Sequence, residues 1–62
     1  MKLCYILEDT DALFDAIGRI VLDEGLAYDY EENLVVIGLV EVTFECDPSD
    51  AEKIERILAP LM

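Results

Sequence analysis

Hydrophobic and polar residues alternate strictly in the segment VEVTFEC, residues 40–46, and this alternation limits the fold more than any other feature of the sequence. The hydrophobic positions are Val40, Val42, Phe44 and Cys46, and the polar positions between them are Glu41, Thr43 and Glu45. Successive side chains of a strand point to opposite faces of a sheet. The pattern therefore predicts a β-strand with one buried and one solvated face.

The residues before this segment predict a hairpin. LAYDY is a short strand with Leu26, Tyr28 and Tyr30 on one side, and EEN, residues 31–33, is a tight connection in which Asn33 tolerates a left-handed conformation. Residues 34–46 then form one long extended strand. Gly38 marks a bulge or bend within it.

The chain opens with a further strand, KLCYILE. Its odd positions, Leu3, Tyr5 and Leu7, point opposite to Cys4 and Ile6. Both faces are therefore apolar, and we expect this strand to be well covered.

Two segments predict helices. Hydrophobic residues recur at helical spacing between the first two strands, at Leu13, Phe14, Ile17, Ile20 and Val21. This predicts a helix over residues 11–23, with Asp9 or Thr10 as its N-cap and Gly25 as its C-terminal stop. We expect Asp15 to support it by pairing with Arg19 one turn later.

The acidic segment FECDPSDAEK, residues 44–53, predicts the start of the second helix. Asp47 suits the N-cap and Pro48 the first turn, while Ser49 with Glu52 is an alternative capping box. The hydrophobic face of this helix is Ala51, Ile54, Ile57, Leu58 and Leu61. Pro60 is expected to end regular structure, and Glu52 to pair with Arg56.

The predicted order is β-α-β-β-α in one small α+β domain, residues 1–62. A right-handed split crossover places the first strand beside the third, with the second strand at the outer edge of a three-stranded antiparallel sheet and both helices on one face. This order is similar to the ferredoxin-like superfold without its last strand. The first strand is then an open edge, at which a second subunit or a partner can pair.

Charge and hydrophobicity limit the classes of partner. The chain has 15 acidic and 4 basic residues and a net charge of −11, which repels nucleic acid and anionic membranes. Direct nucleic-acid and membrane binding are therefore not expected, whereas a basic protein surface would be attracted. Hydrophobic residues make up 55% of the chain, more than so small a domain can bury, which favours self-association or a protein partner.

The sequence predicts neither an enzyme nor a cofactor. It contains no histidine, a single serine, and no twelve-residue calcium loop. Cys4 and Cys46 are expected to be buried, reduced thiols that lie near each other on neighbouring strands, which fits a cytoplasmic protein. No signal peptide or membrane-spanning segment is predicted.

The acidic residues are expected to gather at the two ends of the sheet. The first end holds Glu8, Asp9, Asp11, Asp29, Glu31 and Glu32, and the second holds Asp23, Glu24, Glu45, Asp47, Asp50 and Glu52. Helix starts account for several of them. Asp23 and Glu24 at a helix C-terminus, and Glu31 and Glu32 in a turn, have no such explanation, so either solubility or a negatively charged binding surface accounts for these four.

Two residues of the first helix are unusual. Leu22 lies opposite the hydrophobic face, and Gly18 lies at its margin, where a close approach of another group would explain a glycine. We expect the segment GLAY, residues 25–28, to cover Leu22. The alternative is an exposed contact patch formed by Phe14, Gly18 and Leu22.

Two hypotheses of function follow. In size and charge the chain resembles phage-encoded anti-restriction and anti-CRISPR proteins, which implies an inhibitor that mimics nucleic acid and blocks the basic groove of a nuclease or other nucleic-acid-binding protein. Its expected contact residues are Asp23, Glu24, Tyr28, Asp29, Tyr30, Glu31 and Glu32. The alternative is a regulatory or assembly module that dimerises through the first-strand edge or the first helix, and whose acidity serves solubility.

Overall fold

The computed structural model describes all 62 residues. Its elements are β1 (Lys2–Glu8), α1 (Asp11–Gly18), a π-helical turn (Arg19–Asp23) that continues α1, β2 (Ala27–Val36), β3 (Leu39–Cys46) and α2 (Ala51–Leu58). Single 3₁₀ turns, Pro48–Asp50 and Ala59–Leu61, flank α2. The predicted order β-α-β-β-α is confirmed.

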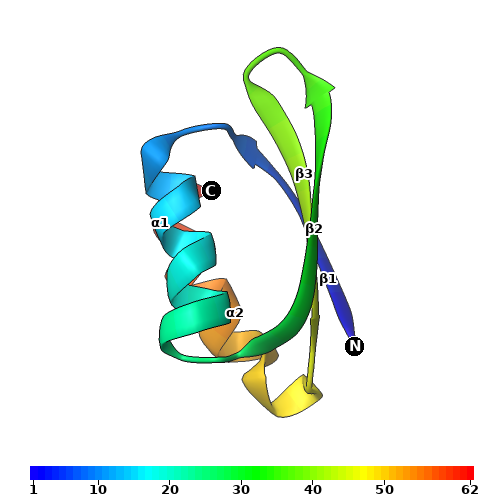
Figure 1. The fold of residues 1–62 in the computed structure, drawn as a ribbon, viewed down its shortest axis with the longest axis vertical. Helices are drawn as coiled ribbons and strands as arrows, with labels where there is room; N and C mark the ends of the chain where they lie inside the picture. Colours follow the sequence, from blue (N-terminus) through cyan, green and yellow to red (C-terminus); the bar gives the residue numbers. More distant parts are fainter.

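The three strands form one antiparallel sheet in the order β1-β3-β2, as predicted. Both helices lie on the same side of this sheet (Figure 1). The other side is covered by no element, and we call it the open face. Its side chains come from the even-numbered residues of β1 and from the odd-numbered residues of β3, which are opposite each other in the β1–β3 register.

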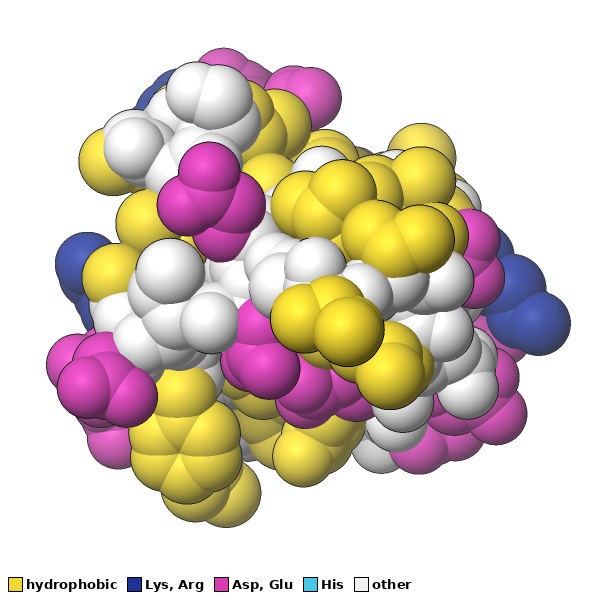
Figure 2. Space-filling model, turned by 90° about the horizontal axis from the view of Figure 1, so that it is seen from above, with side chains coloured by type: hydrophobic (Ala, Val, Ile, Leu, Met, Phe, Trp, Pro, Cys, Tyr) yellow, Lys and Arg dark blue, Asp and Glu magenta, His cyan; other side chains and the backbone are white.

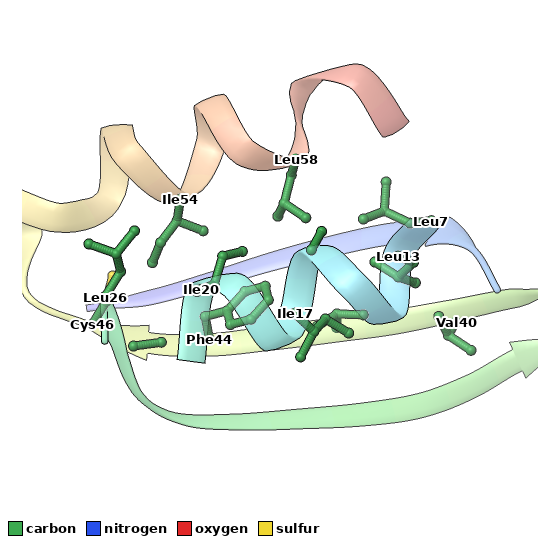
Figure 3. Packing of buried hydrophobic residues seen from close by; sticks show 13 residues of the cluster. Leu7, Leu13, Ile17, Ile20, Leu26, Val40, Phe44, Cys46, Ile54 and Leu58 are labelled. Carbon is green, nitrogen blue, oxygen red and sulfur yellow. The ribbon is translucent and has the colours of Figure 1, made fainter. Parts of the chain in front are cut away.

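The core lies between the helices and the covered side of the sheet (Figure 3). Every second residue of β3 is buried, and the four are Val40, Val42, Phe44 and Cys46, so the predicted alternation is confirmed. Ile17, Ile20 and Ile54 pack on them from the helices. No buried side-chain polar atom lacks a hydrogen-bond partner, so no unpaired side-chain polar group in the core lowers the free energy of unfolding.

The predicted position of the hairpin turn is wrong. The turn lies at Ile37 and Gly38, whereas Glu31 and Glu32 are within β2, opposite Thr43 and Val42. Gly38 has a φ of +87°, a conformation that glycine adopts without steric cost, whereas no non-glycine residue, Asn33 included, has a positive φ. The glycine therefore turns the chain, and β2 extends over ten residues instead of five.

Only one side of β1 is covered, contrary to the expectation of a well-covered strand. Leu3, Tyr5 and Leu7 face the helices, whereas Cys4 and Ile6 are exposed on the open face. Cys4 lies opposite Thr43, so it is on the other side of the sheet from the buried Cys46. The expectation of two neighbouring buried thiols is therefore wrong, and the geometry rules out a bond between them.

The first helix has the predicted bounds but an unpredicted π-helical turn. Thr10 caps it, accepting a hydrogen bond from the Leu13 amide at 3.2 Å, and Gly25 ends it with a φ of +59°. Because a π turn stacks residues five apart, Arg19 donates to Glu24 at 2.8 Å and does not form the expected pair with Asp15. Glu24 thus has a local partner, which the sequence did not indicate.

The second helix is preceded, as predicted, by a turn that starts at Pro48. The α-helix itself ends at Leu58, and Pro60 lies within the 3₁₀ turn that follows it, so regular structure continues to Leu61. Its Glu52–Arg56 pair is present, with an N–O distance of 2.6 Å. The Asp47 side chain, however, makes no capping hydrogen bond, and only its backbone carbonyl accepts from the Asp50 amide. The start of α2 therefore depends on backbone geometry and Pro48 more than on the acid predicted as its cap.

Candidate interaction surface

The structure does not gather the seven predicted contact residues on one surface. Along β2, Asp29 and Glu31 are opposite Glu45 and Thr43 and lie on the open face. Tyr30 and Glu32 alternate with them and lie on the helix side. The strand period of two therefore divides a contiguous acidic stretch between two surfaces.

The open face is strongly acidic. Its acidic residues come from all three strands and are Glu8, Asp29, Glu31, Glu41 and Glu45. Lys2 is the single basic residue among the strand residues of this face. Asp29 and Glu45 are directly opposite on neighbouring strands, an arrangement of like charges that destabilises a sheet. The fold itself gains nothing from this pair.

Little of this charge is neutralised within the chain. Glu45 lies 3.8 Å from the N-terminal amine and 3.9 Å from the Lys2 ammonium, which are long distances for ion pairs. The Asp29 carboxylate accepts a hydrogen bond from the Tyr30 amide at 2.9 Å. The two other ion pairs, Arg19–Glu24 and Glu52–Arg56, lie on or beside the helices, so Glu8, Glu31 and Glu41 have no basic partner.

Tyr28 borders the open face. A β-bulge between Ala27 and Asp29 leaves Tyr28 without a partner on β3, and 70% of its surface is exposed. Desolvation raises the pKa of the Tyr28 hydroxyl, and the nearby charges of Glu45 and Asp47 raise it further. The predicted alignment of Tyr28 with Tyr30 is wrong because the bulge shifts the register between them.

A second surface, which we call the helix groove, lies between α1, its π-helical turn and β2. It has a volume of about 200 Å³ and is lined by Phe14, Ile17, Gly18, Val21, Leu22, Tyr30 and Glu32. Phe14 and Leu22 are 77% and 80% exposed, so the segment of residues 25–28 does not cover Leu22 as expected. The alternative interpretation, an exposed apolar patch, agrees with the structure.

Two details of the helix groove differ from the sequence-based expectation. A Cβ atom at Gly18 would meet nothing within 4 Å, so no close approach explains this glycine. Tyr30 packs inward, with its ring centroid 6.5 Å from that of Phe44. Tyr30 therefore belongs partly to the edge of the core.

Asp23, another predicted contact residue, is the last residue of the π-helical turn and forms no ion pair.

Three acidic residues of the open face, Glu8, Glu41 and Glu45, are absent from the predicted contact set. The alternation of β3 did place Glu41 and Glu45 on a solvated face. The alternation does not give the strand order and register, which place Glu45 opposite Asp29 and put Glu41 on the same face of the sheet as Glu31. A charged surface made of three strands is visible only once the strands are paired.

Two observations concern metal ligands and thiol reactivity. No group of three or more His, Cys, Asp or Glu side chains is arranged to hold a metal ion. Burial raises the pKa of the Cys46 thiol, and although the N-terminal amine lowers it, the charges of Asp50 and Asp47 raise it again. The thiol is therefore protonated at neutral pH and is a poor nucleophile.

No helix is long and apolar enough to cross a bilayer.

Comparisons with protein-family models, with curated proteins and with solved structures find no significant match to this chain.

Proposed function

We propose that this chain is a small acidic inhibitor that competes with nucleic acid for the basic groove of a nuclease or other nucleic-acid-binding protein, as anti-restriction and anti-CRISPR proteins do. The observation that supports this proposal is the open face, where five acidic side chains from three strands meet one lysine. The like charges of Asp29 and Glu45, which are directly opposite each other, destabilise the sheet. Basic residues of a partner would neutralise these charges, so binding would remove the repulsion between them.

The geometry of the open face suits such a groove. Neighbouring strands are ~4.8 Å apart, and residues on one face of a strand repeat every ~6.6 Å, so the carboxylates form an array on a scale comparable to phosphate spacing in nucleic acid. Tyr28 at its border offers apolar area with a polar tip, the kind of side chain that anchors protein interfaces. Electrostatic attraction of this kind raises association rates and weakens as salt increases.

The first test is capture of partners from a nuclease-treated bacterial lysate on the tagged protein, with washes at low and then high salt. We expect nucleic-acid-binding proteins that elute at high salt and are displaced by added DNA or RNA. A partner that is indifferent to salt and to nucleic acid would argue against the proposal.

Reversing one charge on each side of β2 locates the contact surface. Glu31→Lys changes the open face, whereas Glu32→Lys makes the same change of net charge at the neighbouring position on the helix side. We expect Glu31→Lys to weaken binding to the captured partner by at least ~10-fold, since truncated or reversed charges at an interface cost ~2 kcal/mol or more. Glu32→Lys should change it much less.

Equal effects of the two variants would mean that net charge, and not the open face, determines binding. Circular dichroism of both variants checks that they remain folded. Because both residues are exposed strand positions, we expect the two variants to fold equally well.

A regulatory or assembly module is the second candidate, and the helix groove is the observation that favours it. Large exposed hydrophobic side chains such as Phe14 and Leu22 mark protein-binding surfaces when they lie together around a hollow. Binding through this groove would depend on apolar contact and would persist at high salt. Phe14→Ser would then abolish capture of the partner, and Glu31→Lys would not.

A further inference from the structure

The sheet has two free edges, and they differ. The β2 edge contains two register shifts, between Ala27 and Asp29 and between Leu34 and Val36, and it carries three acidic residues. Bulges and charges of this kind protect an edge strand from pairing with another chain. β1 has neither protection, because its register with β3 is continuous from Lys2 to Glu8 and its five central residues are uncharged.

The hydrogen-bonding groups that β1 presents at its free edge follow from its register. The Met1 carbonyl accepts from the Cys46 amide, and the Asp9 amide donates to the Gly38 carbonyl. Bonded and non-bonded pairs alternate in an antiparallel ladder, so the odd-numbered residues of β1 bond to β3. The even-numbered residues therefore direct their N–H and C=O groups away from the sheet, and these residues are Lys2, Cys4, Ile6 and Glu8.

The sequence of β1 is self-complementary in the antiparallel direction. When the strand is paired with a second copy of itself about Tyr5, the free even-numbered residues meet one another, and all seven residues find a partner. Lys2 of each copy then faces Glu8 of the other at both ends of the strand. Cys4 faces Ile6 of the second copy on the open face, and Leu3 faces Leu7 on the helix side.

The surroundings of β1 leave room for such a strand. An open hollow of about 480 Å³ runs along this edge and is lined by residues 4–8 together with Leu39, Leu61 and Met62. Ile6 and Met62 are 58% and 63% exposed, and pairing would cover both.

Figure 2 views the molecule from the hairpin end, where hydrophobic side chains make up much of the surface and acidic side chains far outnumber basic ones.

We propose that two copies of this chain associate through their β1 edges in a two-fold symmetric, antiparallel pair with Tyr5 facing Tyr5, which forms one six-stranded sheet. Opposite charges meet at the new interface even though each copy carries a net charge of −11. The two open faces become one continuous surface, because a two-fold axis perpendicular to the sheet keeps like faces on the same side. This inference does not depend on the proposed function.

Charge exchange between Lys2 and Glu8 tests the pairing. Lys2→Glu and Glu8→Lys each place like charges at both ends of the interface, and we expect each to raise the dimer dissociation constant roughly tenfold or more. The double variant restores opposite charges and should restore most of the affinity. Glu8→Lys is the cleaner single variant because it leaves the contact between Lys2 and Glu45 within the chain unchanged.

Sedimentation equilibrium over a range of protein concentrations, in ~0.15 M salt, measures these constants. A monomeric parent protein at the highest concentration would overturn the proposal. So would single variants that dimerise as strongly as the parent, or a double variant that remains as weak as the single ones.

Cysteine crosslinking tests the register independently. In a Cys4→Ser background, Tyr5→Cys would place two thiols opposite each other in a non-hydrogen-bonded pair, with Cα atoms ~4.5 Å apart, within the range of a disulfide. Leu3→Cys is the matched control, because Leu3 of one copy would lie four residues, ~14 Å, from Leu3 of the other. Under mild oxidation we expect a covalent dimer from Tyr5→Cys and little from Leu3→Cys. Equal crosslinking of both, or none from Tyr5→Cys, would contradict the proposed pairing.

Discussion

Two glycines with opposite backbone requirements illustrate how much depends on single residues in this chain. Gly38 turns the hairpin with a φ of +87°, whereas Gly18 lies in α1 with an ordinary helical φ of −59°. Beyond the adjacent backbone, no atom lies within 4 Å of the position that a Cβ would take at either glycine. Any cost of adding a methyl group must therefore come from the backbone and not from a clash.

The same substitution at the two glycines should have opposite effects. We expect Gly38→Ala to destabilise the protein by ~1–2 kcal/mol, since left-handed conformations are strained for L-residues. Gly18→Ala should stabilise it by ~0.5–1 kcal/mol, because alanine has the higher helix propensity. Urea unfolding of both variants measures these changes, and destabilisation by Gly18→Ala would indicate an unseen constraint on the helix groove.

At the scale of the element, the two helices start by different means. Thr10 satisfies the Leu13 amide with its side chain, whereas Asp47 makes no side-chain capping bond and Pro48 fixes the first turn before α2. Both helices contribute one apolar side to the core, with Leu13 and Ile17 from the first and Ile54 and Leu58 from the second. Tertiary packing, more than capping, therefore holds α2 in place.

Removal of the two N-cap side chains should distinguish these starts. Thr10→Ala is expected to cost ~1 kcal/mol, because the Leu13 amide loses its partner. Asp47→Ala should cost no more than a few tenths of a kcal/mol, which is the attraction of an exposed acid to the helix dipole. Thermal unfolding at one protein concentration compares them. A larger loss from Asp47→Ala would show that this side chain caps α2 in solution.

At the scale of the whole molecule, an elongated body of 32 × 18 × 18 Å carries a net charge of −11. The hairpin projects beyond the helices at one end, where Ile37 is 98% exposed (Figure 1). All four ion pairs are exposed or partly exposed, so each contributes little to the free energy of unfolding. Repulsion among the acidic residues therefore outweighs attraction across the molecule.

Salt should accordingly stabilise the fold. At ~0.15 M ionic strength the Debye length is ~8 Å, shorter than the body, so added salt screens repulsion between distant carboxylates. We expect the melting temperature to rise by several degrees between ~10 mM and ~0.5 M sodium chloride. The Glu8→Lys variant, examined at the same concentrations, controls for a contribution from dimerisation. A melting temperature that falls with salt would mean that the few ion pairs dominate.

Part of the candidate surface was predictable from the sequence, and part was not. The alternation along β3 identified Glu41 and Glu45 as solvated, and the exposed patch of Phe14 and Leu22 was one of two alternatives for α1. The division of Glu31 from Glu32 was not predicted, because a turn at residues 31–33 removes the strand alternation there, whereas the observed turn lies at residues 37–38. The wrong turn position therefore predicted Glu31 and Glu32 at one end of the sheet, whereas they lie within β2 on its two opposite faces.

Local patterns in the sequence predict the order of elements, the buried side of β3 and the starts of both helices, because hydrophobic periodicity and helix-end residues are local properties. The hairpin position, the exposure of Cys4 and Ile6, and the acidic open face follow from the tertiary structure alone. A run of apolar residues such as 34–40 fits a strand wherever the turn lies, and a strand does not specify whether a layer covers its second side. Those outcomes depend on which strands pair and on how many helices are present to cover the sheet.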